Sequence, residues 1–179
     1  MRVLTTIAIV ILVVAFAFGD TGAHKYVGVD KCKTCHKLAK YGDQLGIWAK
    51  SKHAHAYETL AGEEALAVGK KMGIENPQKS EKCLTCHVTA FAVADSMKAA
   101  TLTMAEGVGC ESCHGPGADY MKMSVMKDRE KAIAAGLLIP NEKTCLTCHN
   151  EKSPTYKPFD FAKREKEIAH PIPKADAGK

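Results

Sequence analysis

The sequence predicts a mainly α-helical fold with extensive loops and little or no β-structure. Helix-capping residues and glycine or proline stops recur along the chain, whereas runs of β-branched residues are scarce after the N-terminal apolar segment. Aromatic residues make up only 6% of the 179 residues, and Trp48 is the single tryptophan. The polypeptide is therefore too poor in large apolar side chains to build a sizeable interior by itself.

The first half of the chain is predicted to alternate short helices with irregular segments. Residues 24–30 are expected to be extended or irregular. Asp43 is placed to cap a helix over residues 44–60, and a weaker helix is predicted over residues 63–72. Ser80 is expected to cap a further short helix.

The second half is predicted to contain one long helix and two shorter ones. The long helix covers residues 118–135, and Gly136 ends it. Asn141 is a good cap for the next helix. A last helix is predicted over residues 160–170, where Pro171 stops it.

Four copies of the pattern Cys-x-x-Cys-His account for all eight cysteines. Two cysteines three positions apart lie on one side of a helical turn, so both sulfurs can bond the vinyl groups on one edge of a porphyrin. The histidine that follows is then the proximal iron ligand. We therefore predict four covalently bound c-type haems. The predicted thioether anchors are Cys32, Cys35, Cys83, Cys86, Cys110, Cys113, Cys145 and Cys148, and the predicted proximal ligands are His36, His87, His114 and His149.

Structural zinc sites and disulfides are the alternatives to haem for paired cysteines. Neither requires a histidine directly after the second cysteine, and all four pairs here have one, with no cysteine left over. The pattern therefore favours haem. The porphyrins would also supply the apolar interior that the side chains lack, so we expect the haem-free chain not to fold.

The glycines around the third motif are a separate signal. Gly107, Gly109, Gly115 and Gly117 surround this motif, which predicts either backbone packed close against a haem or an ordinary glycine-rich turn. The second and third motifs are also the closest in sequence, so we expect their haems to be neighbours.

Residues 1–23 are predicted to be a signal peptide, with cleavage near residue 17 or 23. Its apolar run, Val3–Phe18, is shorter than the roughly 20 residues of a bilayer span, although a retained N-terminal anchor is the alternative. Residues 24–170 then form a single tetrahaem domain, and residues 171–179 a loose tail. The predicted location is periplasmic or otherwise extracytoplasmic, with no membrane span once the signal is cleaved.

The charge of the chain argues against a nucleic-acid partner. The formal net charge is +5, and the haem propionates would bring the loaded protein close to neutral. The lysines are also dispersed, without a dense run beside aromatic residues. We expect periplasmic or membrane-bound redox proteins as partners, and an oligomer is compatible with the sequence.

The sixth iron ligands decide whether a haem is closed or open to small molecules. Four histidines lie outside the motifs, enough to close every haem. His53 shares a predicted helical stripe with Ala49 and Ala56, small residues that would let a porphyrin approach, so it is a predicted distal ligand. His55 lies about 200° further round the same predicted helix on a polar face, and is either a second distal ligand or a surface residue.

The other two histidines lie near the ends of the predicted domain. His170 ends the last predicted helix and is a predicted distal ligand. His24 precedes the first motif on an extended arm, from which it could close a haem in its own chain, close one in a neighbouring subunit, or bind none. The methionines have spacings that fit core packing better than ligation.

Several segments together resemble the tetrahaem cytochrome c-554 family. The similarity covers about residues 26–170, and the glycine-flanked third motif is its most specific part. It implies a mostly helical fold around closely spaced haems, partly in stacked pairs, that relays electrons in the periplasm. The segments that carry it are Trp48–Ala54, Cys83–Val88, Gly107–Gly117, the fourth motif and Lys157–Phe159.

The resemblance also implies roles for individual residues. It implies that His53 and His170 are distal ligands, and that the haem on His87 has an open face near the loop Lys157–Phe159. The family has a histidine shortly after the third motif, whereas residues 115–139 contain none here. We infer that His24 or His55 replaces that ligand.

The leading prediction is an electron carrier rather than an enzyme, with mostly bis-histidine haems. One alternative is a redox enzyme or a nitrogen-oxide-binding cytochrome that uses a five-coordinate haem on His87. The other is a subunit of a cytochrome filament or complex in which His24 ligates a haem of a neighbouring protomer.

Overall fold

The computed structural model describes residues 24–171, and helices are the main regular secondary structure over this range. Ten short α-helices and a few 3₁₀ turns are joined by long loops, and the single β-bridge among these residues pairs Tyr26 with Lys98. This confirms the predicted mainly α-helical fold. The predicted signal peptide and the tail from residue 172 lie outside the described residues.

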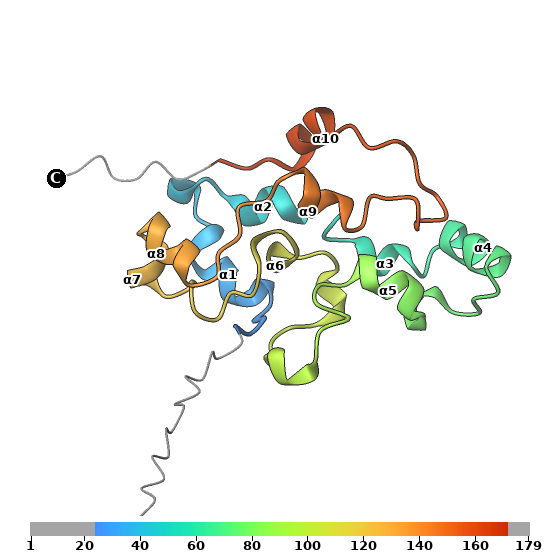
Figure 1. The fold of residues 1–179 in the computed structure, drawn as a ribbon, viewed down its shortest axis with the longest axis horizontal. Coiled ribbons are helices and arrows are strands. Elements are labelled where there is room, and N and C mark those ends of the chain that lie inside the picture. The colour runs from blue at the N-terminus through green and yellow to red at the C-terminus, as the bar shows by residue number, and fades with distance from the viewer. Residues whose placement is uncertain (1–23, 172–179) are drawn as a thin grey trace, which may run out of the picture.

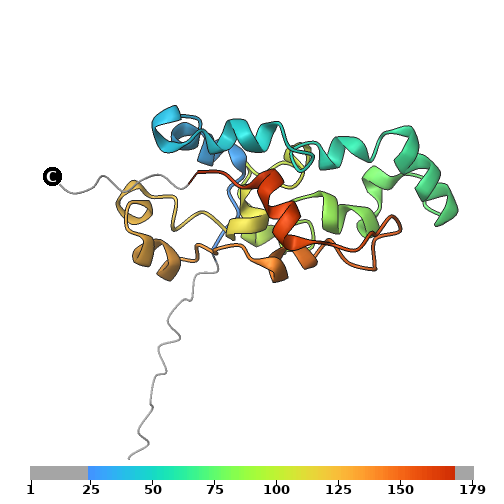
Figure 2. The same cartoon turned by 90° about the horizontal axis from the view of Figure 1, so that it is seen from above.

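The molecule is elongated, with short helices spread along its long axis. Figure 1 shows α7 and α8 at one end, α4 at the other, and α1, α6 and α9 between them, and α10 crosses the middle of the molecule in Figure 2. The helices are α1 (Val29–His36), α2 (Gln44–Ala49), α3 (Ala56–Thr59), α4 (Glu63–Lys71), α5 (Glu81–His87), α6 (Cys110–His114), α7 (Met123–Met126), α8 (Arg129–Ala134), α9 (Glu142–Leu146) and α10 (Phe161–Ile168).

The predicted helix starts are largely confirmed, because side-chain oxygens accept hydrogen bonds from free amides of the first turn. The Asp43 carboxylate accepts from the Gly46 amide at 3.2 Å at the start of α2. Asn141 forms a capping box with Thr144 at the start of α9. Ser80 precedes α5 as predicted, but its hydroxyl makes no capping bond.

The predicted helix over residues 44–60 is wrong in its extent. α2 ends at Ala49, residues 50–55 form turns, and the short α3 follows. His53 and His55 therefore lie in a turn, and the predicted helical stripe that joined His53 with Ala49 and Ala56 is absent. A tertiary contact explains the break, because the Val108 amide donates to the His53 carbonyl oxygen at 3.0 Å.

The predicted helix over residues 118–135 is also shorter than expected. Residues 118–122 form turns, and α7 and α8 replace the single helix. Asp128 divides them, because its carboxylate accepts from the Lys131 amide at 3.1 Å and starts a new helix. The last helix stops at Ile168, which leaves His170 beyond its end.

The buried apolar interior is small for the described length. Its one cluster joins Leu60, Leu84 and Val88, beside the half-buried Tyr57 and Phe91. Several large apolar side chains are exposed instead, including Met123 and Leu138, each more than half exposed. The remaining buried apolar residues are Val27, Val29, Tyr120 and Ala132.

Candidate functional site

All eight cysteines are free thiols of intermediate exposure. The first three motifs lie on α1, α5 and α6, whereas α9 contains Cys145 but ends before Cys148 and His149. Among residues 24–171, no three His, Cys, Asp or Glu side chains converge on a common metal position. The structure therefore offers four pairs of thiols that are free for covalent attachment.

The motifs meet in pairs that sequence spacing does not reveal. The Cys32 thiol contacts Cys110, and this contact, followed by burial, raises its pKa; the first and third motifs therefore adjoin. Burial and the neighbouring Cys148 raise the pKa of Cys86 to about 11, so the second and fourth motifs adjoin as well. Burial and Cys145 raise the pKa of Cys113 to about 11, so the third and fourth motifs also adjoin.

The second and third motifs are neighbours as well, through the backbone. The buried Thr89 hydroxyl donates to the Gly107 carbonyl oxygen at 3.0 Å and accepts from the Gly109 amide at 2.7 Å. It also lies 2.9 Å from the Ser112 hydroxyl on α6. The chain just after the second motif is thus fixed to the loop that enters the third.

Three of the four motif histidines have a ring nitrogen held by an oxygen that can only accept. The Nδ1 atom lies 3.2 Å from Gln44 Oε1 in His36, 2.7 Å from the Ala56 carbonyl oxygen in His87, and 3.1 Å from the Leu138 carbonyl oxygen in His114. Each Nδ1 must therefore carry the proton. The Nε2 lone pair is left free, as an iron ligand requires.

Two motif histidines face a second histidine across a gap that suits one iron. The ring centres of His53 and His149 are 6.0 Å apart, and those of His114 and His170 are 5.9 Å apart. Two iron–nitrogen bonds of about 2 Å, with ring centres about 1 Å beyond each nitrogen, give a separation of about 6 Å. These residues therefore fit haem irons with histidine on both faces.

Burial keeps these imidazoles in the neutral form that ligates metals. Burial, and then the adjacent His149, lower the pKa of His53. Burial also lowers the pKa of His149, with a smaller contribution from Arg164. Burial lowers the pKa of His114 as well. A neutral ring offers its lone pair at neutral pH without first losing a proton.

The His53 turn is held by the loop that leads into the third motif. Trp48 Nε1 donates to the Val108 carbonyl oxygen at 2.9 Å, and the Val108 amide donates to the His53 carbonyl oxygen. Gly107 has φ +63°, and a Cβ atom there would lie 2.8 Å from that same oxygen. The glycine is thus required for close approach of two protein backbones.

Phe159 lies against the fourth motif. Its ring stacks on His149 with centres 4.7 Å apart and planes 22° apart. The loop Lys157–Phe159, which the family resemblance places near an open haem on His87, therefore contacts the histidine of the fourth motif. Because Cys86 and Cys148 adjoin, the loop still belongs to the region where the second and fourth motifs meet.

The remaining candidate histidines have different surroundings. Within the described residues, neither His36 nor His87 forms a ring pair with another histidine. His55 Nδ1 lies 3.1 Å from the Glu58 carboxylate, and both side chains are largely exposed. His55 therefore lies at the surface.

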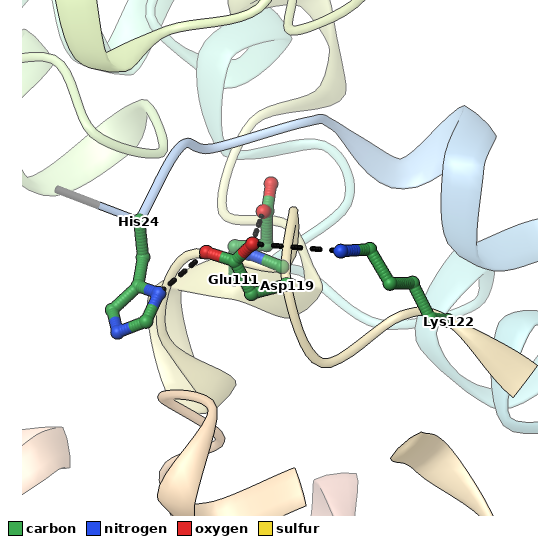
Figure 3. A network of polar contacts seen from close by, with 5 residues as sticks. His24, Glu111, Asp119 and Lys122 are labelled. Atoms are coloured by element: carbon green, nitrogen blue, oxygen red, sulfur yellow. Dashed lines mark hydrogen bonds and ion pairs between the residues drawn. The ribbon is translucent and has the colours of Figure 1, made fainter. Parts of the chain in front are cut away.

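His24 is fixed on an aspartate. Its Nδ1 lies 2.6 Å from Asp119 Oδ2, and Figure 3 shows Lys122 on the opposite side of this carboxylate, at 4.0 Å. Gly136, with φ +100°, leaves room for the ring, because a Cβ atom there would lie 3.0 Å from His24 Cδ2. The carboxylate accepts the Nδ1 proton, so Nε2 is free to ligate.

The strap that precedes the first motif, residues 25–28, is clamped by a buried carboxylate. Glu111, only 3% exposed, accepts from the Val27 amide with both oxygens and from the Gly28 amide at 2.8 Å. It also accepts from the Gly117 amide at 2.6 Å, and Figure 3 shows it beside the His24–Asp119 pair. One side chain of the third motif thus fixes both the strap and the loop after that motif.

Sequence reasoning singled out neither Glu111 nor Gln44. Glu111 occupies a variable position of its motif, where an acidic residue normally signals solvent. Gln44 is buried, and besides holding His36 it donates to the Pro171 carbonyl oxygen at 3.0 Å, next to His170. No local pattern marks either role, because their partners are distant in sequence.

Comparison with known proteins agrees with this geometry. The family described as "Cytochrome c554 and c-prime" matches residues 31–115. The chain is also 31% identical, over 143 residues, to cytochrome c-554 of Nitrosomonas europaea, and the match covers 69% of this chain. It spans only 57% of that relative's length. No solved structure matches the chain. The paired thiols and following histidines thus fit covalently attached haem, and the chain is a c-type cytochrome that belongs to the cytochrome c-554 family.

Proposed function

We propose that this protein is a tetrahaem electron carrier of the periplasm or another extracytoplasmic space. The proposal assigns residues 24–170 to one haem-binding domain and residues 1–23 to a signal peptide. Its partners would be redox proteins, and no helix among residues 24–171 is long and apolar enough to cross a bilayer. The observation that carries the proposal is the pairing of His53 with His149 and of His114 with His170.

Each bound haem would supply an iron that alternates between the ferric and ferrous states. The chain's own residues do the positioning. Histidine on both sides of an iron excludes small ligands and leaves electron transfer as the available chemistry. Two pairs of attachment points lie close together, because the Cys32 thiol adjoins Cys110 and the Cys86 thiol adjoins Cys148. This closeness favours the passage of electrons from one haem to the next.

Replacing His53 tests this assignment. In His53→Ala the iron held by His149 loses its sixth ligand, so the reduced variant should bind one more equivalent of carbon monoxide per chain than the unaltered protein. Titration followed by the haem absorption bands measures this. His55→Ala, two residues away with its ring on Glu58, should leave the carbon monoxide stoichiometry unchanged. Equal stoichiometry in His53→Ala and the unaltered protein would contradict the assignment.

A second candidate function, small-molecule binding at an open haem, is favoured by the surroundings of His87. Its Nδ1 is held by the Ala56 carbonyl oxygen, and within the described residues no histidine ring pairs with it. Nitric oxide or carbon monoxide added to the reduced protein distinguishes the candidates. An unchanged spectrum would leave only the electron carrier.

His24 and Asp119 give a further prediction about closure of the remaining sites. We expect His24 to ligate an iron and Asp119 to orient it, because its carboxylate holds Nδ1. Asp119→Ala should therefore raise the carbon monoxide affinity of that site by about 10–100-fold. Lys122→Ala is the matched control, since it removes only the partner at 4.0 Å. A fall in oligomeric size on His24→Ala would place the iron in a neighbouring subunit, and an unaltered spectrum would exclude ligation.

A further inference from the structure

Two carboxyl groups lie between the first and third motifs, and their surroundings differ sharply. The charges of both groups act to raise the pKa of the Cys32 and Cys110 thiols, so both carboxyl groups lie near those two attachment points. Glu111 accepts backbone amides with both of its oxygens. Glu106 accepts the Val29 amide at 3.1 Å with Oε2, whereas its Oε1 is buried and has no hydrogen-bond partner.

The unpartnered oxygen belongs to a residue that lines a cavity between α1 and α2. This cavity has a volume of about 320 Å³ and is lined by Glu106, Trp48 and Thr101 among others. Asp30 and Lys33 also line it, and their side chains are 70% and 50% exposed. Water thus has a route from the surface toward the Glu106 carboxyl group.

We propose that Glu106 is a proton-binding site coupled to electron arrival at the haems of the first and third motifs. This inference rests on the proposed electron-carrier function. The step balances: one electron comes from the redox partner, one proton comes from solvent through the cavity, and the only bond formed is O–H on Glu106. Oxidation reverses it. A buried carboxyl oxygen without a donor is costly when ionised, and an added electron nearby increases that cost.

The neighbouring charges agree with this role. Burial raises the pKa of Glu106, the backbone amides of Val29 and Thr103 oppose that effect, and Glu111 and Asp30 raise the pKa further. Lys33, the cation on the cavity wall, is paired with Asp30 at 2.6 Å, so part of its charge is already compensated. Reduction of a nearby haem raises the pKa of Glu106 again. At a pH between the oxidised-state and reduced-state pKa values of Glu106, each reduction should therefore be accompanied by binding of a proton.

The test is the pH dependence of the haem reduction potentials. For a one-electron step coupled to one proton, each tenfold fall in proton concentration lowers the potential by at most about 59 mV. In the unaltered holoprotein we expect such a slope for a haem of the first or third motif. Glu106→Gln should lose it, because the amide keeps an acceptor for the Val29 amide but binds no proton. Asp30→Asn, on the exposed rim, should keep it.

Infrared difference spectra supply an independent readout. Reduction of the unaltered protein should produce a protonated carboxyl band that shifts in heavy water and is missing from Glu106→Gln. If the haems of Glu106→Gln were reversibly reduced with an unaltered pH dependence of their potentials, this inference would be overturned and the electron-carrier function would stand. If the unaltered protein showed no reversible haem reduction, the proposed function itself would be overturned.

Discussion

The haem-free chain should lack a cooperative fold. Ordering a residue costs about 1–2 kcal/mol in backbone entropy, and burial of apolar surface has to offset that cost. The described residues bury seven apolar side chains and leave others, such as Leu138, more than half exposed. The porphyrins would supply the missing contacts, so a chain with all eight cysteines changed to serine should lose most of its helical circular dichroism and its thermal transition.

The control for this experiment is the same sequence with its cysteines intact, exported and loaded with haem. It should unfold cooperatively and resist proteolysis. If the serine variant kept both the helical signal and a sharp transition, the small core around Leu60, Leu84 and Val88 would be sufficient, and the interpretation of the haems as the interior would be wrong.

Removing Glu111 should be the most damaging single substitution outside the haem ligands. Glu111→Ala leaves the amides of Val27, Gly28 and Gly117 without their acceptor. Each unsatisfied buried donor costs about 1–3 kcal/mol, so with some water entering the vacated space we expect a loss of about 3–6 kcal/mol. That is a large part of the 5–15 kcal/mol, roughly, that stabilises a typical domain.

Denaturant unfolding of the holoprotein, followed by haem absorbance, measures this loss. The stability of Glu111→Gln should lie between that of the unaltered protein and that of Glu111→Ala, because the amide side chain offers one acceptor oxygen where the carboxylate offers two. Glu81→Gln, an exposed position on α5 of the second motif, is the matched control and should change stability by less than about 0.5 kcal/mol. An unfolding midpoint for Glu111→Ala equal to that of the unaltered protein would show that the strap is held by other contacts.

Local signals predicted the helices that depend on local chemistry. The caps at Asp43 and Asn141 and the helix over residues 63–72 are found, because each is decided by neighbouring residues. The helices predicted over 44–60 and 118–135 are broken instead. One is interrupted by a distant amide that binds the His53 carbonyl oxygen, and no propensity within the segment encodes that contact.

The candidate site was predictable in its residue types and less so in its arrangement. The motifs specify the thiols and their following histidines, but not that the first motif meets the third and the second meets the fourth. His53 lies against His149 although it stands in a turn, so the stripe that singled it out does not exist. The hydrogen-bond partners of Glu111 and Gln44 could not be predicted for the same reason, since only the fold brings these partners close.

The pairing of His114 with His170 has a consequence for biogenesis. A chain exported as proposed would cross the membrane from its N-terminus, so the third motif would emerge well before residue 170. Haem attached there would remain open on one side until the final segment arrives, whereas haem attached to the fourth motif would find His53 already present. Truncated or stalled chains would therefore carry reactive, uncapped iron, and the C-terminal segment would mark the end of maturation.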